Sequence, residues 1–148
     1  MEQILKRRVE MLNKAIEIAN RTHAGQHDKA GEPYILHPLR VMLGLETELE
    51  RICGVLHDVV EDSDISFEYL LGEGFSEEVI DVLDHITKRD GESYDDFIGR
   101  IIDNKIACKV KLADLHDNMD ITRIKNPRAE DIERIKKYKR AADKIENA

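Results

Sequence analysis

Apolar residues recur at spacings of three and four along most of the chain, and no segment alternates as a strand does. In 4–19 they form one face, while Lys6, Arg7, Glu10 and Glu17 take the other. The same pattern, with capping residues and glycine or proline breaks, predicts further helices over 39–45, 48–60, 66–71, 76–85, 94–103, 105–122 and 129–145. The sequence therefore predicts an all-α domain of seven or eight helices over residues 1–148.

Two of these helices, 48–60 and 105–122, are the most apolar and should form the centre of the fold. Segment 24–38 differs, because it carries two glycines and two prolines and reads as a loop that ends at the next helix. Pro38 suits the first position of that helix.

Both central helices contain polar residues where a buried helix should have none. His57 and Asp58 interrupt the first, and Asp114 interrupts the second. Glu61 and Asp62 follow one turn later, so one helix end is expected to present an imidazole and three carboxylates on a narrow arc. Buried or crowded carboxylates require a cation or several hydrogen-bond donors. One shared metal ion is the simplest partner for both helices.

Imidazole and carboxylate ligands suit Mn²⁺, Fe²⁺ or Zn²⁺ better than Ca²⁺, which prefers oxygen ligands alone. No cysteine lies near these positions, which argues against a structural zinc site. The alternative is a hydrogen-bonded His–Asp pair at a helix end without a metal. Two apolar helices with internal acids, together with His37 in a proline-bounded loop, favour the metal site.

Net charge, apolar runs and cysteine content indicate which binding partners and which location to expect for this chain. The formal net charge is −8, which argues against broad binding to nucleic acid or anionic membranes, because phosphates require a basic surface. A small anionic substrate remains compatible, since a metal ion and a few local lysines can invert the field inside one cleft. No apolar run approaches the ~18 residues of a membrane span, so the cytoplasm is the expected location. Cys53 and Cys108 lie in apolar stretches and are expected to be reduced.

Four segments, in this order, resemble the hydrolase domain of the RelA/SpoT alarmone enzymes and their small stand-alone relatives. They are HAGQHDKAGEPYILHP (23–38), VLHDVVED (55–62), ITK (86–88) and VKLADLHDNMD (110–120). The resemblance runs from about residue 12 to residue 123. It implies a helical bundle of the HD type, one divalent metal ion, and a manganese-dependent reaction in which guanosine 3′-pyrophosphate derivatives lose their 3′ pyrophosphate.

The resemblance also implies roles for individual residues. The implied metal ligands are His37, His57, Asp58 and Asp114. Glu61, Asp62 and Asn118 match residues implicated in catalysis. A divalent ion polarises a phosphoryl oxygen and lowers the pKa of bound water, and Glu61 is a candidate acceptor for the proton of that water. Asp62 is a candidate to position the water or to share this role.

Four residues are candidates for contact with a nucleotide substrate. Lys29 can pair with phosphate as a point charge, and His27 can stack on the substrate. Lys88 and Lys111 are further candidates to face phosphate, although a charged helix end is a common structural feature. The other histidines, His23, His85 and His116, are expected to have structural roles.

The chain departs from the RelA/SpoT motifs at three places, one of which is the absence of the Tyr-Ala-Pro-Leu-Ala segment that follows in the long enzymes. The usual Arg-Lys pair is Asp28-Lys29 here, and ADRLHNM is replaced by ADLHDNMD, which adds Asp117 and Asp120 beside the expected polyphosphate. The metal set is complete, so phosphohydrolysis is still expected, with a guanosine bis(diphosphate) as the leading substrate. The alternatives are a hydrolase for another nucleotide, a nucleotide sensor without turnover, and a protein that uses the metal only for stability.

Overall fold

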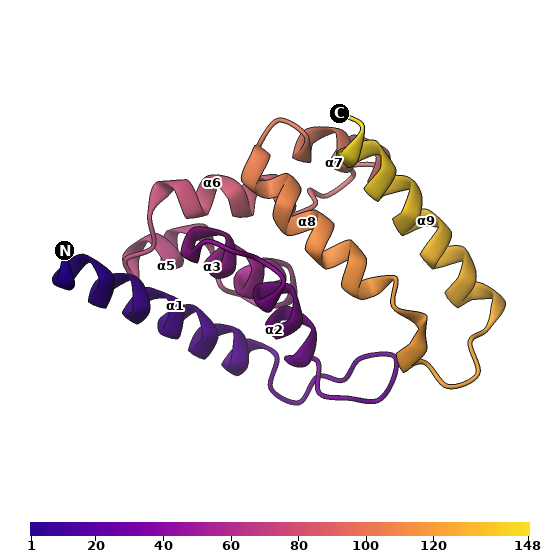
Figure 1. Ribbon diagram of the computed structural model, residues 1–148, viewed down its shortest axis with the longest axis horizontal. Coiled ribbons are helices and arrows are strands. Elements are labelled where there is room, and N and C mark those ends of the chain that lie inside the picture. Colours follow the sequence, from indigo (N-terminus) through magenta and orange to yellow (C-terminus); the bar gives the residue numbers. More distant parts are fainter.

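A computed structural model describes residues 1–148 and contains helices joined by loops, with one isolated β-bridge between His27 and Pro33 (Figure 1). The helices are α1 Glu2–Thr22, α2 Leu36–Leu43, α3 Glu48–Leu56, α4 Val59–Asp62, α5 Phe67–Gly72, α6 Glu77–Ile86, α7 Tyr94–Ile101, α8 Lys105–Asn118, the 3₁₀ helix η1 Ile121–Arg123, and α9 Ala129–Glu146. The predicted all-α class is confirmed. None of these helices combines the length and the apolar character that a membrane crossing requires.

One cluster of 26 buried apolar residues runs through the structure. Helix α3 lies at its centre and contacts α1, α2, α6 and α8, while α8 also contacts α7 and α9. Figure 1 shows α2 and α3 between α1 on one side and α8 and α9 on the other. The two helices with misplaced polar residues are therefore the central ones, as the apolar pattern predicts.

Helix starts follow the expected capping chemistry. Ser76 and Ser93 accept a hydrogen bond from the backbone N–H three residues later, as Thr47, Ser66 and Asn104 also do. Each such cap stabilises a helix by about 1 kcal/mol, because it satisfies a backbone donor that has no partner within the helix. These caps fix where the central helices begin.

The single helix expected over 48–60 is two helices in the structure. Helix α3 ends at Leu56, and α4 begins at Val59, because Asp58 leaves regular helical geometry with φ −103° and ψ −3°. The side chains of His57, Asp58, Glu61 and Asp62 therefore do not lie on one continuous helical face. His57, Asp58 and Glu61 still line one pocket, whereas Asp62 lies outside it.

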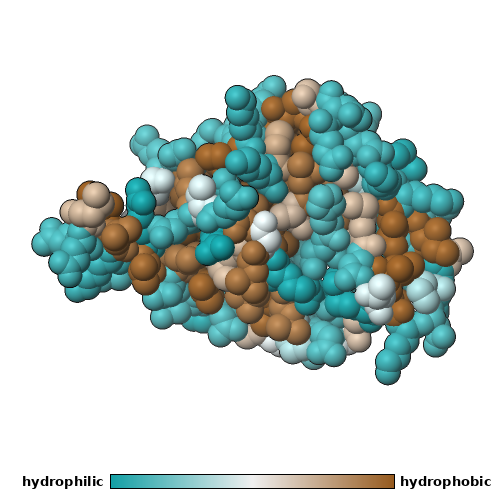
Figure 2. Space-filling model, viewed as in Figure 1, coloured by the Kyte–Doolittle hydropathy of each residue, from teal (hydrophilic) through white to brown (hydrophobic).

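Other boundaries move by a few residues. Helix α2 begins at Leu36, which places His37 and Pro38 within its first turn, and α8 ends at Asn118 before η1. Helix α1 is longer than expected, and its start protrudes from the body of the molecule. Figure 2 shows apolar side chains on this protruding part, where Ile4 and Val9 are more than half exposed.

Gly54 in α3 permits the close approach of the segment that contains α2. A Cβ atom at this position would lie 2.6 Å from Leu45 Cδ1 and 3.5 Å from Met42 Cα. The missing side chain thus lets α2 pack directly on α3. This contact brings His37, on α2, close to His57, at the end of α3.

Candidate metal centre

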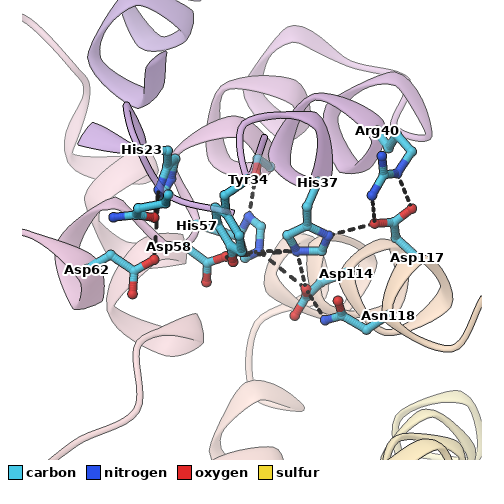
Figure 3. Close-up of polar contacts among 12 residues, drawn as sticks. His23, Tyr34, His37, Arg40, His57, Asp58, Asp62, Asp114, Asp117 and Asn118 are labelled. Atoms are coloured by element: carbon cyan, nitrogen blue, oxygen red, sulfur yellow. Dashed lines mark hydrogen bonds and ion pairs between the residues drawn. The ribbon is translucent and has the colours of Figure 1, made fainter. Parts of the chain in front are cut away.

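Four of the predicted residues meet between α2, α3 and α8 (Figure 3). The Nε2 atoms of His37 and His57 lie 3.3 Å apart. Asp114 Oδ1 lies 2.9 Å from the first of these atoms and 3.3 Å from the second. Asp58 Oδ2 lies 3.0 Å from His57 Nε2 and 3.8 Å from His37 Nε2. His37, His57 and Asp114 are buried, so the cluster sits within the protein.

These separations fit a single ion. Ligand atoms about 2.1 Å from a metal are about 3.0 Å apart across a right angle and about 3.4 Å apart across a tetrahedral angle. The observed separations of 2.9 to 3.8 Å include both values. Potential ligand atoms of His37, His57 and Asp58 all lie within 4.8 Å of one another. Asp114 adds a second carboxylate to this group.

The orientation of the two imidazoles also favours a cation. His57 Nδ1 donates to the carbonyl of Gly54 at 2.6 Å, and His37 Nδ1 donates to Asp117 Oδ2 at 2.7 Å. With its hydrogen on Nδ1, each neutral ring directs the lone pair of Nε2 towards the other ring and the carboxylates. Two lone pairs and two carboxylates facing one another require a proton or a metal ion between them.

The carboxylates raise the proton affinity of this centre. Burial lowers the pKa of His57, but Asp58 and Asp114 outweigh it and raise the pKa well above its usual value. Conversely, burial raises the pKa of Asp114, while Lys111 and His57 lower it well below the usual value. The carboxylates of this centre therefore favour the binding of protons or of a cation beside the two imidazoles.

Three further side chains complete the cluster. Tyr34 donates its hydroxyl proton to Asp58 Oδ2. Lys111 Nζ donates to Asp114 Oδ2 at 2.9 Å, and Asn118 Nδ2 donates to Asp114 Oδ1 at 3.0 Å. Burial and the neighbouring Asp58 raise the pKa of Tyr34, so its hydroxyl remains a donor.

Two pockets flank the centre. The larger, of about 400 Å³, is lined by His27, Lys29, Arg40, Arg123 and Arg134 among others. The smaller, of about 240 Å³, is lined by Glu61, Lys88, Tyr94, Lys111 and Lys137 among others. Tyr34, Asn118 and Tyr138 line both. The centre therefore lies between two pockets that are lined by both basic and acidic side chains.

The acidic pair after the HD motif is split between two environments. Glu61 lines the smaller pocket, and its Oε1 accepts a hydrogen bond from the backbone N–H of Lys88 at 2.7 Å. Desolvation of its carboxyl raises the pKa of Glu61. Asp62 instead points towards His23, with 3.8 Å between Oδ2 and Nδ1 (Figure 3). It lines neither pocket.

The predicted substrate residues also divide between the pockets. His27 and Lys29 line the larger one, and Lys88 lines the smaller one. Lys111 reaches the smaller pocket, but its ammonium group is already paired with Asp114. The basic pocket residues that sequence reasoning missed are Arg40, Arg134 and Lys137.

The added acids line the larger pocket, and each is hydrogen-bonded within the protein. Asp28 Oδ1 accepts two backbone N–H groups at 2.9 Å within its own loop. Asp117 accepts two hydrogen bonds from Arg40, and Asp120 accepts one from Arg123. Burial raises the pKa of Asp117, but its bonds to His37 and Arg40 outweigh this and lower the pKa to about 2.

The remaining histidines have structural surroundings. His23 ends α1, is buried, and its Nδ1 lies 3.0 Å from Gln26 Oε1. His85 Nδ1 donates to the carbonyl of Asp81 at 2.8 Å, and His116 is exposed. None of the three contacts the metal centre.

Sequence comparison finds curated relatives of the chain, although no family model matches it. The chain is 44% identical over 79 residues to a guanosine-3′,5′-bis(diphosphate) 3′-pyrophosphohydrolase from Borreliella burgdorferi, which covers 51% of this chain. It is 34% identical over 122 residues to the enzyme of that name from Aquifex aeolicus, which covers 74% of this chain. The chain resembles the RelA/SpoT enzymes.

The same resemblance extends to the fold. A solved structure described as a metazoan ortholog of SpoT that hydrolyses ppGpp matches with a TM-score of 0.73 and 22% identity. The match covers 91% of this chain and 84% of that one. By contrast, the matched regions make up only 12% and 17% of the Borreliella and Aquifex relatives. The HD-type helical bundle expected from the motifs is thus confirmed as the fold.

Proposed function

We propose that this protein is a metal-dependent phosphohydrolase that removes the 3′ pyrophosphate from guanosine 3′,5′-bis(diphosphate). The observation that carries the proposal is the buried centre itself, where two imidazole lone pairs and two carboxylates converge between two pockets that contain basic side chains. The reaction named for the Borreliella and Aquifex relatives supplies the substrate.

In this proposal His37, His57, Asp58 and Asp114 hold one divalent ion, with Mn²⁺ as the leading candidate and Fe²⁺ or Zn²⁺ as alternatives. When bound, the ion supplies positive charge to the reacting phosphoryl group and makes a coordinated water molecule more acidic. Lys111 neutralises the outer oxygen of Asp114, and Tyr34 hydrogen-bonds to Asp58. These bonds hold the two carboxylates in place.

We assign Glu61 as the group that accepts a proton from the attacking water. Its carboxylate lies in the smaller pocket, outside the four-residue cluster, and is anchored by the backbone of Lys88. The raised pKa brings it closer to the range in which a carboxylate is an effective base. Asn118 lines both pockets and is placed to contact substrate. Asp62, outside both pockets, is assigned a positioning role.

The pockets suit the two charged ends of such a substrate. Lys29 and Arg134 supply positive charge in the larger pocket, where His27 offers a ring for stacking. Lys88 and Lys137 supply positive charge in the smaller one. The volumes of about 400 and 240 Å³ agree with a nucleoside diphosphate in the larger pocket and a pyrophosphate in the smaller one.

The test is a turnover assay on metal-stripped protein resupplied with Mn²⁺, Fe²⁺ or Zn²⁺. We expect ppGpp to yield GDP and pyrophosphate, measured by ion-exchange chromatography, and other nucleotides to react more slowly. Asp58→Asn should abolish metal binding and turnover. Asp64→Asn is the matched control, because Asp64 is exposed and lines neither pocket. Metal-loaded protein that turns over no nucleotide would contradict the proposal.

The sensor hypothesis predicts tight nucleotide binding without product. Its motivation is extra negative charge at Asp28, Asp117 and Asp120, but all three carboxylates are engaged within the protein. This engagement favours the hydrolase. Retention of unreacted nucleotide by metal-loaded protein would reverse that preference.

A further inference from the structure

Asp117 links the metal centre to a network outside it. Its carboxylate is 10% exposed and accepts hydrogen bonds from His37 Nδ1 at 2.7 Å and from Arg40 Nε at 2.7 Å (Figure 3). Arg40 Nη2 adds a bond of 3.1 Å to the same carboxylate. Arg123 Nη2 donates to the Asp117 carbonyl at 2.8 Å and lies 3.5 Å from its Oδ2.

We propose that Asp117 is a positioning residue that, with Arg40 and Arg123, forms a clamp holding the Nε2 lone pair of His37 towards the metal centre. The inference rests on the metal binding of the proposed function and deepens it. Asp117 is not a ligand in this proposal, because its carboxylate lies on the Nδ1 side of the ring, opposite the centre.

The hydrogen bond between His37 and Asp117 selects one tautomer of the His37 imidazole. A neutral imidazole carries one N–H, on either Nδ1 or Nε2, and a carboxylate can only accept. Asp117 at 2.7 Å therefore selects the form with its hydrogen on Nδ1. A charged acceptor also increases the basicity of the opposite nitrogen, which strengthens its bond to a metal. His57, in contrast, is oriented by the neutral carbonyl of Gly54.

Arg40 and Arg123 both pair with the Asp117 carboxylate and offset its charge. A carboxylate with one imidazole partner would be costly to bury, whereas two guanidinium groups offset its charge and fix its plane. Arg40 lies three residues after His37 on α2, and Arg123 belongs to η1. The clamp thus joins α2 to α8 and η1. It fixes the orientation of the His37 ring relative to Asp114.

The clamp belongs to this chain and is not implied by the motif resemblance. In ADRLHNM the third residue after the aspartate is histidine, and here that position is Asp117. The added acid that looks unfavourable for a polyphosphate substrate is directed instead at the back of a ligand imidazole.

The test is isothermal titration of metal-stripped protein with Mn²⁺. Loss of an outer hydrogen bond to a ligand histidine weakens metal binding by roughly 10- to 100-fold, and we expect this for Asp117→Asn. Glu92→Gln is the matched control, since it also replaces an arginine-paired carboxylate with an amide, but its partners are Arg100 and the backbone of Arg89, which do not belong to the centre. Its affinity should equal that of the wild type. An Asp117→Asn variant that binds within about twofold of the wild type overturns the inference, whereas a wild type that binds no divalent ion counts against the proposed function.

The tautomer itself gives a readout that requires no metal. Nitrogen-15 NMR of metal-free wild type, at alkaline pH where the imidazole is neutral, should show His37 with its hydrogen on Nδ1. Asp117→Asn should shift this ring towards a mixture of both forms, and Asp117→Glu should restore the wild-type form in part. Should the substituted proteins fail to fold, the wild-type spectrum still decides, because a hydrogen on Nε2 there would overturn the clamp.

Discussion

At the scale of single residues, the centre keeps its charges apart by giving each carboxylate a different partner. Asp114 holds Lys111 on one oxygen and faces the imidazoles with the other. Lys111 is itself largely buried, 14% exposed, and lies over the ring of Phe97 at 5.3 Å. This lysine therefore has a structural partner in Asp114 and also lines the smaller pocket.

The first prediction concerns this buried pair. Lys111→Met should lower the free energy of unfolding of the metal-free protein by about 3 kcal/mol, because it leaves Asp114 buried without its partner. Added Mn²⁺ should recover part of the loss, since it binds only the folded state. Urea denaturation with and without Mn²⁺ measures both effects. Lys109→Met is the control, because Lys109 pairs with Glu50 at 3.5 Å but is 62% exposed, and should change stability by less than about 1 kcal/mol. Equal effects at both lysines would contradict the prediction.

The second prediction separates chemistry from metal binding. Glu61→Gln should lower kcat by roughly 10²- to 10⁴-fold, because an amide cannot accept the proton of the attacking water. The amide oxygen can still accept the Lys88 N–H bond, and Glu61 lies outside the cluster, so the affinity for Mn²⁺ should stay within about twofold. Steady-state kinetics and titration calorimetry measure the two quantities. Glu68→Gln, at an exposed glutamate of α5, should change neither, and an unimpaired Glu61→Gln enzyme would remove Glu61 from the reaction.

At the scale of helices, the geometry of the centre depends on how closely α2 packs on α3. Gly54 makes this contact possible, and Val41 of α2 lies directly over it, since a Cβ at position 54 would be 3.4 Å from Val41 Cγ1. His37 and His57 are at the ends of the two helices nearest the cluster. Any displacement of α2 from α3 therefore changes the distance between the imidazoles of His37 and His57.

The third prediction follows from that packing. Gly54→Ala should destabilise the fold by about 1 to 3 kcal/mol through overpacking, even though alanine favours a helix by about 1 kcal/mol. Gly99→Ala in α7 is the matched control, because its nearest neighbour would be Lys144 Nζ at 3.8 Å. It should raise stability by up to about 1 kcal/mol. Thermal unfolding measures both variants, and a stabilised Gly54→Ala protein would show that α2 does not constrain α3.

Local signals predict the helices better than they predict the break at Asp58. The caps at Ser76 and Ser93 were predictable because the capping side chain and its N–H partner are three residues apart. The end of α3 was not, because Asp58 is held by Tyr34 and His57, and Tyr34 lies 24 residues earlier in the chain. Apolar periodicity reports which face of a helix is buried, but it contains no information about such distant partners.

At the scale of the whole molecule, local sequence signals could predict residues of the centre, but they could not predict the groups around it, whose partners are distant in sequence. Asp58 and Asp114 could be identified because charged residues in apolar helices are costly to bury and must have a partner, whereas the complete set with His37 and His57 followed from the motif resemblance. The clamp and the pockets could not be identified, since Asp117 meets His37 across 80 residues of sequence. Only the motif PYILHP gave a signal for Tyr34, three residues before His37. The fold class and the donor set are thus predictable, whereas the groups that orient the donors depend on tertiary packing.

The last prediction concerns the stability of the whole molecule against pH. Arg100 joins the end of α6 to the loop before α7, because it donates to the carbonyls of Asp84 and Thr87 and pairs with Glu92 at 2.9 Å. The bonds from Arg100 and the backbone of Arg89 lower the pKa of Glu92 to about 2, from an ordinary value of 4.5. A lowered pKa in the folded state stabilises the protein above the ordinary value, and this stabilisation is lost as the pH falls towards the lowered one.

Glu92→Gln should therefore unfold more easily than the wild type at pH 7, and the difference should shrink as the pH falls from about 4.5 towards about 2. Urea denaturation at closely spaced pH values measures the two curves. Glu17→Gln, at an exposed glutamate of α1 without an ion pair, is the control for loss of one carboxylate. A difference between Glu92→Gln and wild type that stays constant down to pH 2 would mean that the arginine is held by its carbonyl partners alone. The link between α6 and α7 would then be independent of the Glu92 charge.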